Sequence, residues 1–358
     1  MLTLIYPYRN RDLKRLKNSL DSLKKQSVSG FEVFFVDYGS DEEIAKASEK
    51  LCKKYEFVIY SYYPTQFQPW NKSRALNSVI RNLETEFCFV ADVDMIFHPQ
   101  FVETAIKLKN FQKAVYFQVG FLDSEEILKE KEFATFKNYR RSTFGATGLS
   151  LFPVKLLKEL RGFDEFYHFW GAEDTDMHVR IENAGYEVEF YKDEVLLLHQ
   201  WHPSYRSSER IDLTRELQKT GIVQLNHQHL KFAIQFRSTM VNKNSWGEIM
   251  SAEEFLELEG VPTNFVFDNE KQKIDDFLYG QLPAMKNKIL KIRIQKDPFQ
   301  NSLKFWIKKQ MGKKVPEYYT LKEINNKILL HLISHYRNKA YNYKISDDLQ
   351  SLELAIKL

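Results

Sequence analysis

The sequence has only two cysteines, Cys52 and Cys88, and they stand far apart in the chain. Their spacing fits neither a zinc site nor a disulfide framework, so a reducing compartment is expected. A large excess of charge of either sign is also missing, because the formal net charge is +4 in 358 residues. This balance argues against a protein built to bind duplexes, and no nucleic-acid partner is expected.

Long apolar runs and glycine-rich phosphate loops are absent as well. No stretch approaches the ~20 apolar residues that a membrane-spanning helix needs. The run Leu2–Tyr6 already has the character of a core strand, so we expect no signal peptide or anchor before it and a cytoplasmic, bacterial protein. The chain has no G-x-G-x-x-G motif and no Walker-type lysine loop, which disfavours dehydrogenases and P-loop proteins.

Aromatic residues, in contrast, are plentiful, with 28 Phe, 19 Tyr and 5 Trp. Most of them are expected in a buried core, and a minority could form surfaces on which sugar rings stack. A chain of this length can build one large core, or a main domain with a smaller lobe.

Up to about residue 200, strand-like and helix-like patterns alternate. Asp12–Gln26, for example, places leucines at helical spacing. The expected strands are Leu2–Tyr6, Phe31–Val36, Phe57–Tyr60, Phe87–Ala91, Val115–Val119 and Val195–His199, and the expected helices are Asp12–Gln26, Glu42–Lys54, Lys72–Leu83 and Ala172–Ala184. Alternation of this kind predicts an α/β fold with a mostly parallel sheet flanked by helices, in which ligands bind at the carboxyl ends of the strands.

From about Tyr205 the pattern becomes mostly helical and polar. We therefore expect a first domain over residues 1–205 and a mainly helical C-terminal region over residues 206–358. Within the second, residues 286–314 hold ten Lys and Arg against one acid, Asp297. This basic segment has three interpretations: a solvated helical face, contact with an anionic membrane surface, or binding of an anionic polysaccharide.

Two carboxylates, Asp92 and Asp94, directly follow the expected strand Phe87–Ala91. At the carboxyl end of a strand they would point into the ligand crevice. Mg²⁺ and Mn²⁺ prefer such oxygen ligands together with phosphate oxygens. The alternative is a turn with two solvated acids.

A second acidic cluster starts the expected helix Ala172–Ala184. Glu173 and Asp174 lie in its first turn, where the helix dipole favours acids in any case. One of these carboxylates could instead accept a proton from an incoming hydroxyl, and Trp170 beside them could stack on a pyranose ring.

Histidines and one further acid follow two other strands. His199 and His202 come after Val195–Leu198, and an imidazole there could complete a metal shell, although loop histidines are common. Asp37, after Phe31–Val36, could accept hydrogen bonds from a nucleobase, while Ser40 or Asp41 caps the next helix.

Taken in order, four blocks of the sequence resemble glycosyltransferase family 2. They are Tyr6–Arg11, Val36–Ser40, Lys72–Asn77 and Ala91–Asp94. A later block, from Arg161–Glu165 through Trp170–Asp176, is similar to the acceptor-side motif of the β-1,4-galactosyltransferases and the bacterial chondroitin polymerases. His199-Gln200 matches the histidine that follows this motif in the polymerases. The resemblance covers about residues 1–205.

The resemblance implies a GT-A fold in which a Rossmann-like half binds a nucleotide sugar and the other half binds the acceptor. Asp37 would contact the base, and Pro7 and Arg9 would line the nucleotide pocket. Arg74 and Asn77 would lie near the diphosphate or the sugar.

For the reaction centre, the resemblance implies that Asp92 holds ribose or sugar hydroxyls and that Asp94 and His199 bind the metal, with His202 as the alternative ligand. Asp174 matches the catalytic base and Glu173 a sugar contact. Two departures stand out: Tyr38 replaces the second acid of the usual Asp-Asp-Gly-Ser run, and Ala172 stands where the galactosyltransferases have Gly.

The expected activity is therefore that of an inverting, Mn²⁺- or Mg²⁺-dependent hexosyltransferase. It would move galactose or N-acetylgalactosamine from UDP to a glycan or a lipid-linked saccharide in polysaccharide biosynthesis, with peripheral contact at the inner face of the plasma membrane. The competing classes are a catalytically inactive carbohydrate-binding GT-A protein and a metal-dependent nucleotidyltransferase. The intact Asp94, Asp174 and His199 argue against the first, and the missing Gly-rich loop argues against the second.

Overall fold

The computed structural model describes residues 1–124, 132–143, 148–203 and 209–358, which form two compact units. The first unit comprises Met1–Gln66, Trp70–Ser207 and Ile222–Ile249, and the second comprises Phe67–Pro69, Ser208–Gly221 and Met250–Leu358. The segment Ile222–Ile249, which the sequence pattern grouped with the C-terminal region, thus belongs to the first unit.

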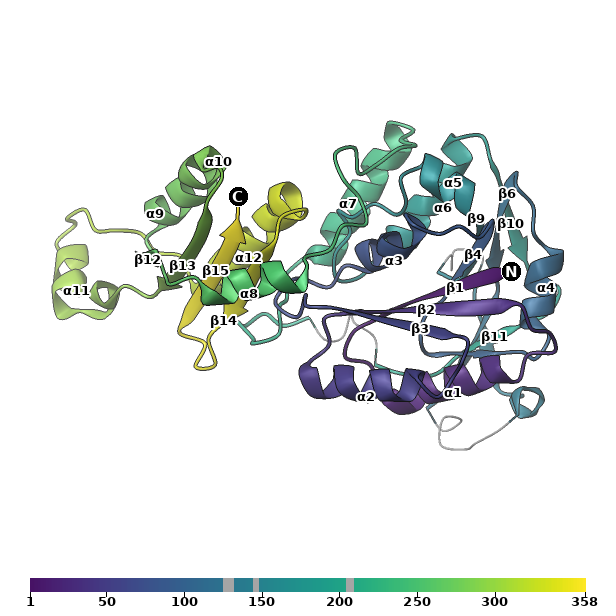
Figure 1. Cartoon of the computed structure of the whole chain (residues 1–358). Helices are drawn as coiled ribbons and strands as arrows, with labels where there is room; N and C mark the ends of the chain where they lie inside the picture. Colours follow the sequence, from purple (N-terminus) through teal and green to yellow (C-terminus); the bar gives the residue numbers. More distant parts are fainter. Residues whose placement is uncertain (125–131, 144–147, 204–208) are drawn as a thin grey trace. The chain divides into compact units, whose positions relative to one another are not determined.

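The first unit is built on a seven-stranded sheet in the order β10-β6-β9-β4-β1-β2-β3 (Figure 1). Its strands are β1 (Leu2–Tyr8), β2 (Phe31–Tyr38), β3 (Val58–Tyr63), β4 (Phe87–Val90), β6 (Lys113–Phe117), β9 (Ser150–Pro153) and β10 (Glu187–Tyr191). Only β9 runs antiparallel to its neighbours. The predicted α/β fold with a mostly parallel sheet is confirmed.

Helices cover both faces of this sheet, with α1 and α2 on one face and α3, α5 and α6 on the other (Figure 1). The helices of the first unit are α1 (Leu13–Lys24), α2 (Glu42–Cys52), α3 (Lys72–Ile80), α4 (Phe101–Lys107), α5 (Val154–Glu159), α6 (Glu173–Asn183) and α7 (Ile222–Gln235), with a short 3₁₀ turn at Phe133–Thr135.

Alternate side chains of the central strands enter two separate hydrophobic layers. Leu4 and Tyr6 of β1 pack in one layer with Leu20 of α1, whereas Ile5 packs in the other with Leu76 of α3. The alternation follows from the two-residue period of a strand. A fully buried leucine contributes about 1.5–3 kcal/mol, so the two layers fix the register of the sheet.

A smaller four-stranded sheet lies beside the metal-ligand candidates. Its order is β5-β11-β7-β8, with β5 (Met95–Phe97), β7 (Val119–Leu122), β8 (Tyr139–Arg141) and β11 (Leu197–His199). In the antiparallel β11–β5 pair, His199 lies opposite Met95. This pairing brings the end of β11 next to the segment that follows β4.

The second unit contains helices and a four-stranded sheet in the order β12-β13-β15-β14. The strands are β12 (Phe265–Asp268), β13 (Ile289–Gln295), β14 (Tyr341–Ile345) and β15 (Ser351–Lys357), and the α-helices are α8 (Ala252–Gly260), α9 (Lys271–Asp276), α10 (Leu282–Ala284), α11 (Leu303–Gln310) and α12 (Leu321–His331). Short 3₁₀ or π turns occupy Phe277–Gln281, Pro298–Asn301 and Leu332–Tyr336. Helical residues outnumber strand residues in this unit, and the sequence pattern did not predict the sheet.

The described residues include no helix with the length and apolar character that crossing a membrane would require.

One buried histidine of the second unit should make stability depend on pH. Burial, followed by the nearby His335, lowers the pKa of His331 from 6.5 to about 4. Unfolding therefore takes up a proton between these values, and the free energy of unfolding should fall by roughly 1–3 kcal/mol as the pH drops from 6.5 to 4. Denaturant unfolding of the wild type and His331→Leu at pH 7 and pH 4 should show a flatter profile for the variant.

The matched control is His227→Leu, which replaces an exposed histidine of the first unit. It should keep the wild-type pH profile. If the wild type and His331→Leu lost the same free energy of unfolding between pH 7 and pH 4, His331 would not be the source of the pH dependence.

Candidate metal and transfer site

Asp94 is the centre of a three-residue group that can hold a cation. Its carboxylate is buried, and Oδ1 has no hydrogen-bond partner among the described residues. His202 Nε2 lies 3.1 Å from Oδ2, and His199 Nε2 lies 3.7 Å from Oδ1. The ligand atoms of the three residues all lie within 4.8 Å of one another. One carboxylate and two imidazoles around a buried, unsatisfied oxygen suit a divalent metal.

The pKa shifts of these groups also favour a bound cation. Burial alone would raise the pKa of Asp94, but the hydrogen bond from His202 and the charges of both imidazoles hold it at about 2. The same hydrogen bond raises the pKa of His202. Asp94 thus stays ionised and draws positive charge toward itself, which a cation can supply in place of the protons.

Gln200 fixes the backbone of this group. Its backbone N–H and its Nε2 both donate to the carbonyl oxygen of Asp94, each at 3.1 Å. Nε2 also donates to the Arg15 carbonyl, and Oε1 accepts from Asn18, both at 2.9 Å. The 1% exposed Gln200 therefore ties the Asp94 segment and the end of β11 to α1.

A second cluster gathers three carboxylates around one ammonium group. Lys72, the first residue of α3, places Nζ 3.2 Å from Asp174, 3.3 Å from Asp92 and 3.8 Å from Glu173. Burial opposes the charge of Lys72, but the three carboxylates raise its pKa well above the ordinary value. The structure thus brings together Asp92, Glu173 and Asp174, which are predicted site residues from two distant segments, around Lys72, which was not predicted.

The two acids at the start of α6 differ in their surroundings. Burial, together with the charge of Asp174, raises the pKa of Glu173 to about 7. Burial also raises the pKa of Asp174, and the charge of Lys72 opposes this. A Cβ atom at Gly148 would lie 3.1 Å from Asp174 Oδ2, so the glycine leaves room on that side of the carboxylate.

A constrained turn presents Trp170 beside these acids. Phe169, Gly171 and Ala172 all have positive φ, at 64°, 104° and 74°. Alanine in this region costs roughly 1–2 kcal/mol relative to glycine, which is the residue that the galactosyltransferases carry at the Ala172 position. Asn226 of α7 donates to the carbonyl of Trp170 at 3.0 Å and so supports the turn, which leaves the indole 39% exposed.

The predicted nucleotide-side residues lie at the ends of β1 and β2. Tyr8 pairs with Asp37, so Pro7 and Asp37 occupy neighbouring strand ends. Asp37 is fully buried and accepts hydrogen bonds from Ser40 N at 2.8 Å and from Tyr60 Oη at 3.0 Å, and burial raises its pKa. Arg9 donates to the carbonyl of Gln66 at 2.6 Å.

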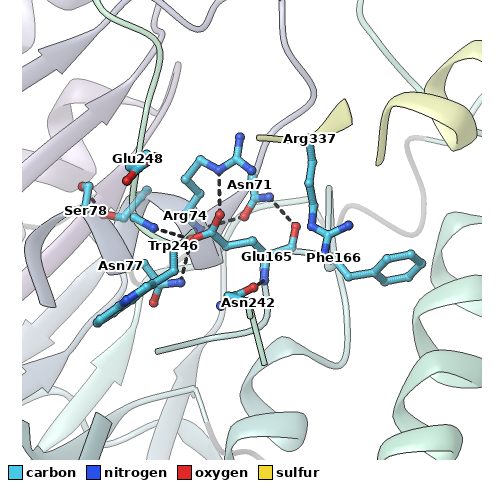
Figure 2. A network of polar contacts seen from close by, with 12 residues as sticks. Asn71, Arg74, Asn77, Ser78, Glu165, Phe166, Asn242, Trp246, Glu248 and Arg337 are labelled. Carbon is cyan, nitrogen blue, oxygen red and sulfur yellow. Dashed lines mark hydrogen bonds and ion pairs between the residues drawn. The ribbon is translucent and has the colours of Figure 1, made fainter. Parts of the chain in front are cut away.

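Arg74 and Asn77, in contrast, point into a buried network around Glu165 (Figure 2). Arg74 Nε donates to Glu165 Oε2 at 2.9 Å, and Asn77 Nδ2 donates to Oε1 at 3.0 Å. The backbone N–H of Gly247 donates to the same Oε1. Both predicted residues thus hold α3 against the segment that leads to Trp170.

Removing the Glu165 carboxylate from this network should strongly destabilise the fold. Glu165→Ala should lower the free energy of unfolding by about 3–5 kcal/mol, because it breaks a buried ion pair by removing the carboxylate that faces the guanidinium of Arg74 at 2.9 Å. Urea unfolding followed by circular dichroism measures the change. The control is Glu248→Ala, which removes an exposed partner of Arg81 and should change stability by about 0.5 kcal/mol or less. Equal effects of the two substitutions would contradict the role of Glu165.

Comparison with known families gives two matches. Residues 3–154 match the model of glycosyl transferase family 2, and residues 129–202 match the model described as the N-terminal domain of galactosyltransferase. The resemblance that the sequence blocks suggested is thereby confirmed for these segments. A search of curated proteins finds no match.

Solved glycosyltransferases are distantly similar in structure. TarS of S. aureus is 19% identical, with a TM-score of 0.42, over 56% of this chain and 36% of that one. The mannosyltransferase PcManGT from Pyrobaculum calidifontis, in complex with GDP-Man and Mn²⁺, is 17% identical, with a TM-score of 0.44, over 68% and 66%. GalNAc-T7 with UDP, GalNAc and Mn²⁺ is 12% identical, with a TM-score of 0.48, over 65% and 48%. The similarity thus spans less than two thirds of the length of each of these proteins.

Proposed function

Because residues 3–154 match glycosyl transferase family 2, we propose that this chain is a metal-dependent glycosyltransferase that inverts the anomeric centre of its sugar. The donor is a nucleotide sugar, with UDP-galactose or UDP-N-acetylgalactosamine as the first candidates, and the acceptor is a glycan or a lipid-linked saccharide. The observation that carries the proposal is the presence, in one unit, of a cation-ligand group at Asp94 and a carboxylate cluster at Asp174.

Asp94 and His199 would hold Mn²⁺ or Mg²⁺, and His202 has the geometry to share the ion. Such an ion, when bound, supplies Lewis-acid stabilisation of the charge that develops on the leaving diphosphate. Gln200 holds the Asp94 backbone in place, so that the carboxylate needs little reorganisation to bind.

Asp174 is the proposed base. Its carboxylate takes the proton of the acceptor hydroxyl while the acceptor oxygen bonds to the anomeric carbon and the bond from that carbon to the diphosphate oxygen breaks. Lys72 favours the ionised form of Asp174. Glu173, with its pKa of about 7, can donate or accept a hydrogen bond to a sugar hydroxyl at neutral pH.

The donor would lie across the ends of β1, β2 and β4. Pro7, Arg9 and Asp37 are proposed for the nucleotide, Asp92 for ribose or sugar hydroxyls, and Trp170 for the sugar face. Arg74 and Asn77 act through Glu165 in this proposal, as residues that position the site and do not touch the donor.

A cellular role follows from the resemblance to bacterial chondroitin polymerases. We propose polysaccharide assembly on the cytoplasmic side of a bacterial plasma membrane.

The test is nucleotide release from a panel of UDP and GDP sugars with the purified chain. UDP should be released from UDP-galactose or UDP-N-acetylgalactosamine in Mn²⁺, and EDTA should abolish the release. A chain that binds these donors without turnover would be the inactive carbohydrate-binding protein. Release of pyrophosphate from UTP and a sugar phosphate would identify a nucleotidyltransferase.

A further inference from the structure

Helix α11 of the second unit has no buried residue, although half of its side chains are apolar. Leu303 is 72% exposed and Trp306 58%, and Met311, which directly follows the helix, is 61% exposed. Ile307 is 43% exposed. Large apolar side chains gathered in this way on a solvent-facing helix usually mark a contact surface.

The four apolar side chains share one side of the helix. Leu303, Trp306, Ile307 and Met311 follow the spacing i, i+3, i+4, i+8, which forms a single stripe. Phe305 lies on the opposite side and packs edge-on against Phe299. The helix is thus attached to its own unit through Phe305, and its apolar stripe faces away from that attachment. Figure 1 shows α11 at one end of the second unit, away from α12.

Lysines border this stripe. Lys304, Lys308 and Lys309 lie on the helix, and Lys313 and Lys314 follow it, with no acid between Asp297 and Glu317. None of the five lysines forms an ion pair among the described residues. The two acids that flank this segment in the sequence already have partners: Glu317 pairs with Lys271 at 3.0 Å, and Asp297 accepts from Tyr318 at 2.7 Å.

We propose that α11, with Lys313 and Lys314, docks on an anionic membrane surface. The apolar stripe enters the boundary between headgroups and acyl chains, and the lysines reach lipid phosphates from both sides of it. A purely solvated face or a polyanionic glycan would explain the lysines, but neither accounts for the exposed aliphatic side chains of Leu303, Ile307 and Met311. The proposal does not depend on the sugar chemistry, so the vesicle experiment can contradict it without contradicting the proposed function.

The test is sedimentation of the full chain with vesicles of phosphatidylcholine, with or without phosphatidylglycerol, at low and high salt. Binding should require phosphatidylglycerol and weaken at high salt. Trp306→Ser and the double variant Lys308→Glu/Lys309→Glu should each lower the partition coefficient about tenfold or more.

Two controls distinguish vesicle binding through α11 from nonspecific vesicle binding by other exposed apolar or basic residues. Ile211→Ser removes an apolar side chain that is 87% exposed, and Lys24→Glu/Lys25→Glu makes the same change of net charge in the first unit. Both should bind vesicles as the wild type does. Absence of binding to anionic vesicles, equal loss in the controls, binding to an anionic polysaccharide alone, or self-association through Trp306 without lipid would overturn the proposal.

Discussion

Asp174→Asn is expected to lower the rate of sugar transfer by about 10²–10⁴-fold, because an amide cannot take the proton of the acceptor hydroxyl. Nucleotide affinity in Mn²⁺ should stay close to that of the wild type, since the proposed ligands of the nucleotide and the metal lie on other segments. The substitution keeps the size of the side chain and removes one of three carboxylates around Lys72. Steady-state turnover and titration with UDP measure the two quantities separately.

Glu182→Gln is the matched control, because it makes the equivalent change on the same helix at a side chain that is 58% exposed. It should leave turnover unchanged. If Asp174→Asn lost UDP binding together with turnover, Asp174 would act in donor binding and not as the base.

Asp94→Asn is expected to abolish Mn²⁺ binding and to lower turnover by about 10²–10⁴-fold, since Lewis-acid stabilisation is worth several kcal/mol. His199→Ala and His202→Ala should each weaken Mn²⁺ binding, because each removes one nitrogen that faces the Asp94 carboxylate. Electron paramagnetic resonance of free Mn²⁺ gives the affinity without reference to activity.

The control for these variants is Glu194→Gln, at a carboxylate that is 55% exposed just before β11. Its Mn²⁺ affinity should equal that of the wild type. If Asp94→Asn bound Mn²⁺ as tightly as the wild type, the ion would have to sit elsewhere.

The main sheet was predictable because its signals are local. The apolar runs of β1 to β4 and the leucine spacing of α1 need only a few neighbouring residues to be read. The position of Asp94 followed from the same pattern, since a residue after a strand lies at the carboxyl edge of the sheet. The approach of His199 to Asp94 depends instead on the pairing of β11 with β5, about a hundred residues apart. The sequence placed His199 and His202 after a strand, where an imidazole could complete a metal shell, but this strand pairing is not predictable from the local pattern.

Lys72 was overlooked although its sequence position carries a signal. A cation at the first position of a helix is disfavoured by the helix dipole, so its presence suggests acidic partners from elsewhere in the chain. Arg74 and Asn77 were selected in its place from the same block, and the structure directs both toward Glu165.

The sheet of the second unit was not predicted because its strand β13 lies in a segment rich in Lys and Arg. β13 alternates buried Leu290, Ile292 and Ile294 with Lys291 and Arg293, a two-residue period within a segment that looked simply basic. Its partner β15 lies more than fifty residues further on. The local sequence pattern predicts neither the pairing of β13 with β15 nor the boundary that places α7 in the first unit.

Anomalous scattering from crystals soaked in Mn²⁺ and UDP would show whether Asp94 binds the ion, because it locates manganese without an activity assay. We expect a manganese peak bonded to the Asp94 carboxylate and to an imidazole of His199 or His202, with the UDP diphosphate on its open side. A peak bound by other residues, or UDP bound in Mn²⁺ with no peak at Asp94, would contradict it.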